Sequence, residues 1–321
     1  NSKSDDFSPT YADKKFRSLV FTSAREGSTG NRIDDWAGQN FSDLYFTQVD
    51  RKGDWSAPSL LDEDNLVNSE ANEGAATFDE KFNTLYFTRC GVGKKQVMGC
   101  QIYTSRRKGR GWAEPELVQI DIDSTVTYGH PTVSADELIL IFASDQKPGS
   151  HGQKDLWMVT RDRKSKPFGK PVNLGSNINT VGNELFPFLR SDTVLYFASN
   201  GHPGMGGLDI FKATLTKEGK WVVENMKSPI NSVSDDFGII CQSAEEKGYF
   251  TSSRTENSKG GDDVYSFVLP GKVFNMAGRV INERTARPVG AAEVRLIASD
   301  GTSLEYKTDS TGAFSFKLRP E

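Results

Sequence analysis

The sequence lacks the features that mark membrane-spanning, nucleic-acid-binding or metal-dependent proteins. Its longest apolar run, residues 138–143, is far shorter than the roughly 20 residues that span a bilayer. The 39 basic and 43 acidic residues nearly cancel, and no basic stretch is long enough to follow a phosphate backbone. Its three histidines are far apart in the chain. We therefore expect no transmembrane segment, no nucleic-acid partner, no metal site and no cofactor.

Cysteine is also scarce, and two of the three cysteines flank a glycine- and lysine-rich loop. Cys90 and Cys100 lie on either side of residues 91–99, between two strand-like runs. If those runs pair as a hairpin, the two sulfurs face each other across the loop mouth. The sequence thus predicts a disulfide and an oxidising compartment. The alternative is a pair of free thiols in a cytosolic protein.

What the chain does have is a pattern that recurs five times. A phenylalanine followed by two mostly small residues stands at positions 21, 87, 142, 197 and 250. A second pattern, an acidic or amide residue before an aliphatic and an aromatic one, begins at positions 43, 101, 155, 209 and 263. The last four of these are 54 residues apart. A fixed period of this length is typical of repeat architectures.

The repeats predict an all-β protein. Each reads as four short runs of β-branched and aromatic residues bounded by turn residues, and no segment shows a sustained helical period. Four-stranded units repeated around a ring form a β-propeller, so we expect five blades over residues 1–270. The fifth repeat shows no obvious fourth strand. Residues 271–321 read as a small β-sandwich, which at this length is expected to be incomplete.

Two sets of polar residues recur with the blades. The polar position expected near the channel mouth is filled by Asp6, Glu73, His130, Glu184 and Asp236. These form either a rim that binds a cation or a basic segment, or buried groups that bond amides between blades. The second pattern begins with Asp43, Asp155, Asp209 and Asp263 in four of the five repeats. We expect these aspartates to accept N–H bonds from the preceding glycine-rich turn.

The repeat resembles PD40, the WD40-like unit related to the periplasmic TolB propeller. The closest match is Ser199-Asn200-Gly201, Gly204, Gly206, Gly207 and Asp209-Ile210-Phe211. Arg25 and Arg254 stand where that family has Ser-x-Arg, whereas Arg89 and Gln101 depart from the pattern. The tail looks like the start of a carboxypeptidase regulatory-like domain, through Gly278, Val280, Thr285, Pro288, Ala292, Val294, Asp300-Gly301, Thr308-Asp309, Gly312 and Phe314.

This domain order is similar to that of Bacteroidetes envelope proteins of the OmpA family, one of which belongs to the type IX secretion system. The resemblance implies a non-catalytic protein-interaction scaffold that is periplasmic and associated with the outer membrane. Its partners would be other envelope proteins, including secretion-system components. Contact with peptidoglycan would come through a flanking domain outside this sequence.

The alternative is a carbohydrate-active five-bladed propeller enzyme or a glycan-binding module. Such hydrolases need non-equivalent carboxylates in a pocket with aromatic platforms for the sugar. Here the acidic residues recur at equivalent repeat positions, which favours a scaffold. The sequence therefore predicts no catalytic residues and no enzymatic activity.

Overall fold

The structure is a computed structural model that describes residues 1–29, 33, 38–92, 97–123, 125–243, 245–269, 274–297 and 303–318. The described residues form strands and turns and no helix, which confirms the all-β prediction. It follows that no described helix is long and apolar enough to cross a bilayer. The chain divides into two compact units, Asn1–Val268 and Leu269–Glu321.

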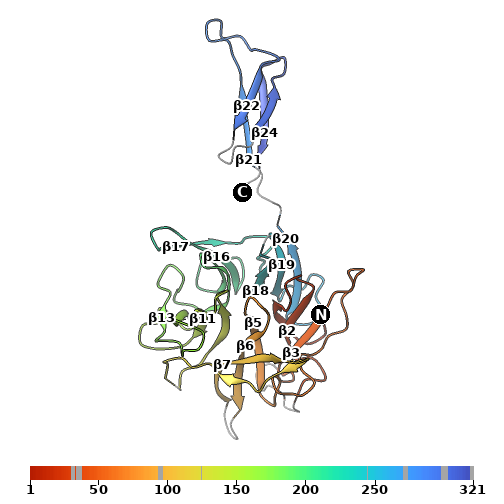
Figure 1. Ribbon diagram of the computed structural model, residues 1–321, viewed down its shortest axis with the longest axis vertical. Coiled ribbons are helices and arrows are strands. Elements are labelled where there is room, and N and C mark those ends of the chain that lie inside the picture. Colours follow the sequence, from red (N-terminus) through yellow and green to blue (C-terminus); the bar gives the residue numbers. More distant parts are fainter. Residues whose placement is uncertain are drawn as a thin grey trace. The chain divides into compact units, whose positions relative to one another are not determined.

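The first unit is the predicted five-bladed propeller (Figure 1). Blade I contains β1 (Asp6–Tyr11), β2 (Ser18–Ser23), β3 (Asp43–Gln48) and β4 (Ser59–Leu60). Blade II contains β5 (Asn72–Phe78), β6 (Thr84–Val92), β7 (Val97–Lys108), β8 (Gly111–Trp112) and β9 (Glu116–Leu117). Blade III contains β10 (Tyr128–Val133), β11 (Ile139–Ser144), β12 (Asp155–Thr160) and β13 (Val172–Asn173). Blade IV contains β14 (Glu184–Ser191), β15 (Val194–Ser199), β16 (Asp209–Leu215) and β17 (Trp221–Asn225). Blade V contains β18 (Asp236–Cys241), β19 (Lys247–Ser252) and β20 (Asp263–Val268).

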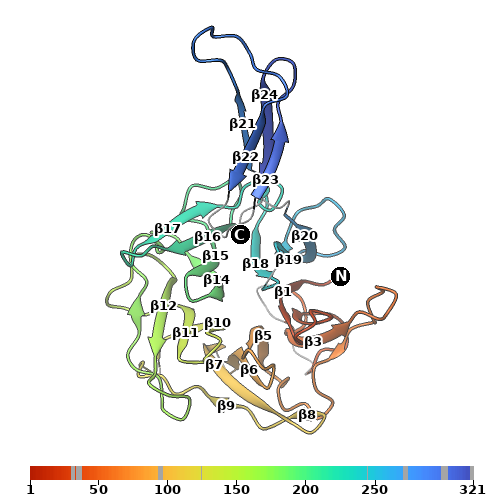
Figure 2. The same ribbon diagram turned by 45° about the horizontal axis from the view of Figure 1, so that its top comes forward.

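The first strand of each blade lies nearest the axis, and β18 contacts β1 to close the ring (Figure 2). The side chains between neighbouring blades form the core. Phe87 and Leu44 are fully buried between blades I and II, and Phe142 is fully buried between blades II and III. In blades II, III and IV, the recurring phenylalanine of the first sequence pattern therefore packs against the preceding blade.

All five first strands carry the same irregularity. The pairing of each with its second strand shifts register near the start of the first strand, as between Phe7 and Thr10 in β1. The residue inside each bulge has positive φ, namely Ser8, Ala75, His130, Phe186 and Gly238. A bulge bends a strand and re-aims a side chain, so these bulges place the residues that line the axis.

Blade V has three strands in the described residues, and its third strand is bonded to Asn1. The Asn1 side-chain amide donates to the Val264 carbonyl (3.1 Å) and accepts from the Val264 N–H (3.0 Å). The same paired contact joins Asn68 to Leu44, Asn179 to Leu156 and Asn231 to Ile210. Asn1 thus belongs to the repeat and ties blade I to blade V.

The second unit contains two antiparallel pairs of strands. One pair is β21 (Phe274–Arg279) with β24 (Ala313–Leu318), and the other is β22 (Glu293–Ile297) with β23 (Ser303–Lys307). Phe316 is buried, and its ring meets that of Tyr306 at 6.1 Å. The alternating residues of the tail thus form a small core.

Candidate functional site

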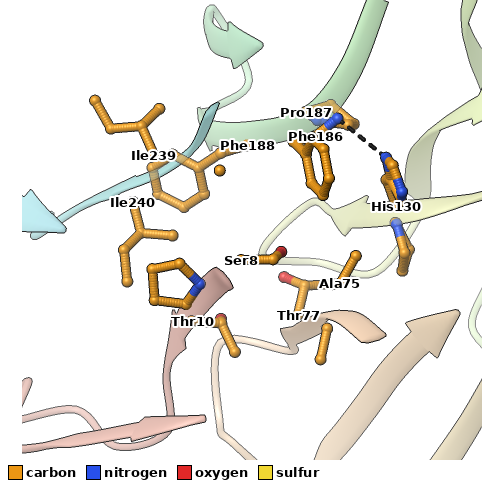
Figure 3. Close-up of a pocket in the computed structure, with 14 residues that line it drawn as sticks. Ser8, Thr10, Ala75, Thr77, His130, Phe186, Pro187, Phe188, Ile239 and Ile240 are labelled. Atoms are coloured by element: carbon orange, nitrogen blue, oxygen red, sulfur yellow. Dashed lines mark hydrogen bonds between the residues drawn. The ribbon is translucent and has the colours of Figure 1, made fainter. Parts of the chain in front are cut away.

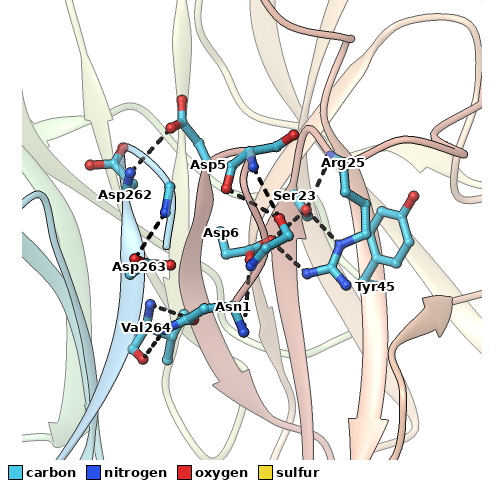
Figure 4. Close-up of polar contacts among 12 residues, drawn as sticks. Asn1, Asp5, Asp6, Ser23, Arg25, Tyr45, Asp262, Asp263 and Val264 are labelled. Carbon is cyan, nitrogen blue, oxygen red and sulfur yellow. Dashed lines mark hydrogen bonds and ion pairs between the residues drawn. The ribbon is translucent and has the colours of Figure 1, made fainter. Parts of the chain in front are cut away.

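The recurring acidic residues at the starts of the first strands are buried in the framework. Asp6 accepts bonds from the Ser2 N–H, from the Ser23 hydroxyl (2.5 Å) and from the Arg25 guanidinium (2.6 Å) (Figure 4). Glu73, Glu184 and Asp236 make the same kind of contact with a Ser or Thr four residues earlier. All four carboxylates are inaccessible to solvent. Each carboxylate therefore fixes the segment that leads into the first strand of its own blade.

An arginine neutralises three of these four carboxylates. Arg25 reaches Asp6 and Arg254 reaches Asp236, both at 2.6 Å, from the position two residues after the second strand. In blade II the cation comes from Arg89, which lies opposite Glu73 in the strand pairing and reaches it at 2.7 Å. Burial nevertheless raises the pKa of Glu73 to about 7, against the opposing effect of Ser69 and Arg89. Arg89 departs from the sequence pattern of the repeat, but it supplies the same arginine–carboxylate ion pair from a different position.

The structure places His130 differently from the other four members of that set. Tyr128 pairs with Ser144 as Asp6 pairs with Ser23, so Tyr128 is the blade III counterpart of the carboxylates. His130 lies two residues further on, in the bulge beside the axis (Figure 3). Its ring stacks on Phe186 at 3.9 Å, and its Nδ1 accepts the Phe186 N–H at 3.3 Å.

Threonines from the second strands explain this bond. The N–H of the bulge residue is accepted by a Thr hydroxyl of the preceding blade at Ser8, Ala75 and His130. The blade before Phe186 carries Ala143 at the threonine position, and His130 supplies the acceptor instead. Burial and then the charge of Lys154 lower the pKa of His130 to about 3, so the imidazole is neutral. Its role in the described structure is that of a hydrogen-bond acceptor between blades.

The axis itself is too narrow for a substrate. The cavity between the five bulges measures about 30 Å³, which is enough for about one water molecule. No group of three or more His, Cys, Asp or Glu side chains capable of holding a metal occurs among the described residues. The four carboxylates expected at the channel-mouth rim do not form an open ring of acidic groups, because each is buried and bonded within the framework.

The second set of aspartates lies at the starts of the third strands and binds the turn before it. Asp155 accepts the N–H groups of His151 (2.6 Å) and Gly152 (3.1 Å). Asp209 and Asp263 do the same with two successive N–H groups of their own loops, and Asp43 with Thr29. Burial raises the pKa of Asp43 to about 6. These four aspartates fix loop conformation.

The two cysteines on the long hairpin of blade II are bonded to each other. Cys90 on β6 lies directly opposite Cys100 on β7, and their sulfurs form a disulfide. The bond closes a loop with a sequence separation of 10 residues. The third cysteine, Cys241, is free and buried, and burial raises the pKa of its thiol to about 11.

A larger opening lies where the first strands end, at the opposite end from the Asp6–Arg25 cluster. This axial funnel has a volume of about 220 Å³ and is lined by residues from all five blades. Its walls include three half-buried aromatic side chains, Phe16, Phe82 and Phe188. Phe16 packs edge-on against Tyr11 at 4.9 Å, which holds the ring in place.

The funnel also carries two exposed carboxylates. Glu80 comes from the first turn of blade II and Asp192 from the first turn of blade IV, and both are exposed. The neighbouring Asp79 is buried and accepts the N–H groups of Asn83 and Thr84, both at 2.7 Å. Asp79 therefore shapes the turn, while Glu80 and Asp192 are free to meet a ligand.

The funnel was not predicted from the sequence, because the prediction was based on residues that recur in every blade. The residues that line it lie at the ends of the first strands and in the turns that follow them. Glu80, Asp192 and Phe82 each belong to such a turn. The available signal was the phenylalanine that recurs in the first turns of blades I and II, as Phe16 and Phe82.

No protein-family model matches this sequence, and no curated protein matches it either. Solved structures do. A thermostable family-43 glycoside hydrolase matches with a TM-score of 0.51 at 12% identity, over 84% of this chain and 90% of that one. An α-L-arabinofuranosidase from Lactobacillus brevis has a TM-score of 0.49 at 10% identity, over 83% and 92%. A family-43 endo-arabinanase from Bacillus licheniformis has a TM-score of 0.47 at 14% identity, over 85% and 97%.

The first of these likenesses overturns the prediction of a non-catalytic secretion-system scaffold, and with it the prediction that the chain is not an enzyme. That prediction took the recurrence of acidic residues as a sign against catalysis. The recurring carboxylates are bonded within the framework. Their structural role is therefore no evidence on the role of Glu80 and Asp192 in the funnel. The chain shares its fold with a family-43 glycoside hydrolase.

Proposed function

We propose that the propeller is a carbohydrate-active protein, and that its glycan site is the axial funnel. The observation that carries this proposal is the combination of Glu80 and Asp192 with three half-buried aromatic rings in one opening. Ligand sites are typically concave and mostly apolar, with a few polar groups that fix orientation. Aromatic rings pack against the apolar face of a sugar, and carboxylates bind its hydroxyl groups.

The reaction that this arrangement supports is hydrolysis of a glycosidic bond. Glycosidases use two carboxyl groups, of which one donates a proton to the leaving oxygen and the other activates water or attacks the sugar. Glu80 and Asp192 are the pair we propose for these roles. They come from blades II and IV, which are not adjacent, so a sugar chain over the axis would pass between them. The shared fold with a glycoside hydrolase supports the same reaction class.

The test is turnover of a panel of α- and β-linked oligosaccharides by the full chain. Glu80→Gln and Asp192→Asn should each lower kcat/KM by at least about 100-fold, the scale of a lost acid or base. Glu218→Gln and Asp162→Asn are matched controls, because both residues are exposed and outside the funnel. Phe82→Ala should mainly raise KM. Turnover that survives both funnel variants, or a panel that is neither cleaved nor bound, would contradict the proposal.

Binding without turnover would favour the glycan-binding module instead. In that case Phe82→Ala should weaken binding while Glu80→Gln and Asp192→Asn leave it within a few-fold, because no proton transfer is involved.

We further propose a periplasmic location associated with the outer membrane, with other envelope proteins and peptidoglycan as neighbours. The Cys90–Cys100 disulfide supports an oxidising compartment, since disulfides are rare in the cytosol. The PD40 type of the repeats and the carboxypeptidase regulatory-like type of the tail are proposals of the same kind, supported by the motif residues. Cell fractionation with an antibody to the chain tests the location.

A further inference from the structure

The hairpins at the ends of the third strands of blades II and III are strongly basic. These two basic hairpins, residues 106–112 and 161–168, carry eight arginines and lysines and one acidic residue, Asp162. The corresponding hairpins are residues 49–55 of blade I and 215–221 of blade IV. Each has two basic residues, against two acidic residues in blade I and one in blade IV. Positive charge is therefore concentrated on two adjacent blades, at Arg106, Arg107, Lys108, Arg110, Arg161, Arg163, Lys164 and Lys166.

Most of this charge is accessible to a ligand. Seven of the eight basic residues are exposed, and the eighth, Arg161, is half-buried. Within the described part of the chain, Lys164 is the only one of the seven that forms an ion pair. It contacts the buried Glu137 at 2.5 Å, and its side chain is still 49% exposed. A surface with this excess of one sign attracts ligands of the opposite sign.

Two arginines fix the basic hairpins to the turns beside the axial funnel. Arg107 and Arg161 stand 54 residues apart, at the same position of the repeat. The Arg107 Nε donates to the Phe82 carbonyl (3.0 Å), and the Arg161 Nε donates to the Glu137 carbonyl (2.8 Å). Each guanidinium also lies over an aromatic ring of its own blade, at 4.6 and 4.3 Å. The basic hairpins are therefore held at a fixed place relative to the funnel.

A cleft of about 580 Å³ lies between blades II and III and is lined by both basic hairpins. Arg106 lies on the blade II wall, and Arg161, Lys164 and Lys166 lie on the blade III wall. The Arg161 guanidinium bonds through its Nε and Nη2, whereas its Nη1 makes no hydrogen bond to any described residue. That N–H group is available to an anion in the cleft.

The cleft lies beside the axial funnel, and two turns separate them. In blade II, Phe82 lines the funnel and Thr84 lines the cleft. In blade III, Ala135 lines the funnel and Glu137 lines the cleft. A chain molecule that is longer than the funnel therefore reaches the cleft by crossing one turn.

We propose that the glycan bound in the axial funnel is acidic, and that the cleft between blades II and III binds its carboxylate or sulfate groups. This inference rests on the proposed function, because it names the class of glycan that the funnel takes. Arginine and lysine form charge-assisted hydrogen bonds with carboxylates, and sulfate presents charged oxygens of the same kind. The exposed Arg106, Arg163 and Lys166 add long-range attraction.

The acidic residues of the cleft favour a glycan over a nucleic acid. Glu114 and Glu116 are exposed on the blade II wall. Carboxylates accept hydrogen bonds from hydroxyl groups such as those of a sugar. They repel the closely spaced phosphates of a nucleic acid. An acidic glycan has both hydroxyl and anionic groups, so it matches both kinds of lining residue.

The test compares two probes with one backbone, hexagalacturonate and its fully methyl-esterified, uncharged form, by calorimetric titration of the full chain. The acidic form should bind at least about tenfold more tightly, the scale of one charge-assisted hydrogen bond. High salt should reduce this preference, because it screens exposed charges. A sulfated galactan hexamer and its desulfated form make a second pair. A preference for the acidic form in either pair supports the inference and identifies the anionic group.

Variants locate the binding. Arg106→Gln combined with Lys166→Gln removes two exposed charges from the cleft, so it should remove most of the preference and leave the uncharged probe's affinity within about twofold. Lys217→Gln combined with Lys220→Gln is the matched control, because it removes two exposed charges from the corresponding hairpin of blade IV. The control should keep the preference. Phe82→Ala, in the funnel, should weaken binding of both forms.

Four results would overturn the inference. Equal binding of both forms in both pairs, weakened by Phe82→Ala, would leave the glycan site in the funnel and remove its acidic class. A preference that both double variants reduce equally would assign it to overall charge. A DNA hexamer bound as tightly as hexagalacturonate, and lost with Arg106 and Lys166, would make the cleft a nucleic-acid site. Binding of no sugar at all would contradict the funnel site as well.

Discussion

Asn1 and Val264 lie 263 residues apart in sequence and exchange two hydrogen bonds, so the first residue of the chain is part of the last blade. The same amide pair occurs between Asn179 and Leu156, at 2.8 and 3.0 Å. In each case a side-chain amide satisfies both backbone groups of the residue after a buried aspartate. The asparagine works as a clamp between the end of one blade and the next.

The hydrogen bonds of this clamp should contribute substantially to the free energy of unfolding. Asn179 is 2% exposed, and Asn179→Ala would leave the Leu156 N–H buried without a partner. We expect a loss of about 1–3 kcal/mol in the free energy of unfolding, the cost of an unsatisfied buried donor. Urea unfolding measures it. Asn177→Ala is the matched control, because Asn177 is exposed and makes one bond to a carbonyl; equal losses would show that Asn179 has no special role.

The buried ion pair of blade V gives a second prediction. Arg254 bonds to Asp236, to the Ser252 hydroxyl and to the Ile230 carbonyl. Arg254→Ala would leave the fully buried Asp236 carboxylate without its cation, at a cost of about 3 kcal/mol. Arg254→Lys keeps the positive charge but loses several of the hydrogen bonds that the guanidinium makes. Its urea midpoint should therefore fall between that of the unmodified chain and that of Arg254→Ala. A lysine variant no better than alanine would show that charge is not what Asp236 needs.

The sequence predicted the propeller because propeller stability depends on what repeats. Phe87, Phe142 and Phe197 are buried between blades, so the repeat period and the fold report the same physical requirement. The register of His130 could not be read in this way. Its blade has Tyr128 in place of the acidic residue, and only the strand pairing shows that His130 lies in the bulge.

The candidate site was harder to predict for a related reason. Glu80 and Asp192 lie in turns that vary between blades, and their meeting at one end of the axis follows from ring geometry rather than from spacing. The Asn1 clamp was also not predicted. Its partner is at the other end of the repeat region, although Asn68, Asn179 and Asn231 each stand five residues before a buried carboxylate, as Asn1 does before Asp6.

The disulfide should stabilise the blade II hairpin without being essential to the ring. The bond closes a loop with a sequence separation of 10 residues, for which the lost chain entropy corresponds to about 2–3 kcal/mol. Cys90→Ser combined with Cys100→Ser should therefore lower Tm by several degrees. A reducing agent should lower the Tm of the unmodified chain by the same amount and leave the variant unchanged. A reducing-agent effect on the variant would point to another cause.

The last prediction concerns pH and follows from the stacked pair His130 and Phe186. The pKa of His130 is lowered to about 3 in the folded protein, whereas an unfolded histidine titrates near 6.5. Below pH 6.5 the unfolded chain binds a proton that the folded chain does not, so stability falls as the pH falls. The limiting slope is about 1.4 kcal/mol per pH unit, which amounts to roughly 2–3 kcal/mol between pH 7 and 4.5.

His130→Asn removes this titration while keeping a side chain that can accept a hydrogen bond. The variant should be less stable than the unmodified chain at pH 7, because it loses the ring stack at 3.9 Å. Between pH 7 and 4.5 it should lose less stability, since the remaining pH dependence comes from other groups common to both chains. Urea midpoints at the two pH values measure the difference. His151→Asn, at an exposed histidine, should keep the full pH dependence, and a His130 variant with that same dependence would show that the imidazole is free to protonate in the folded state.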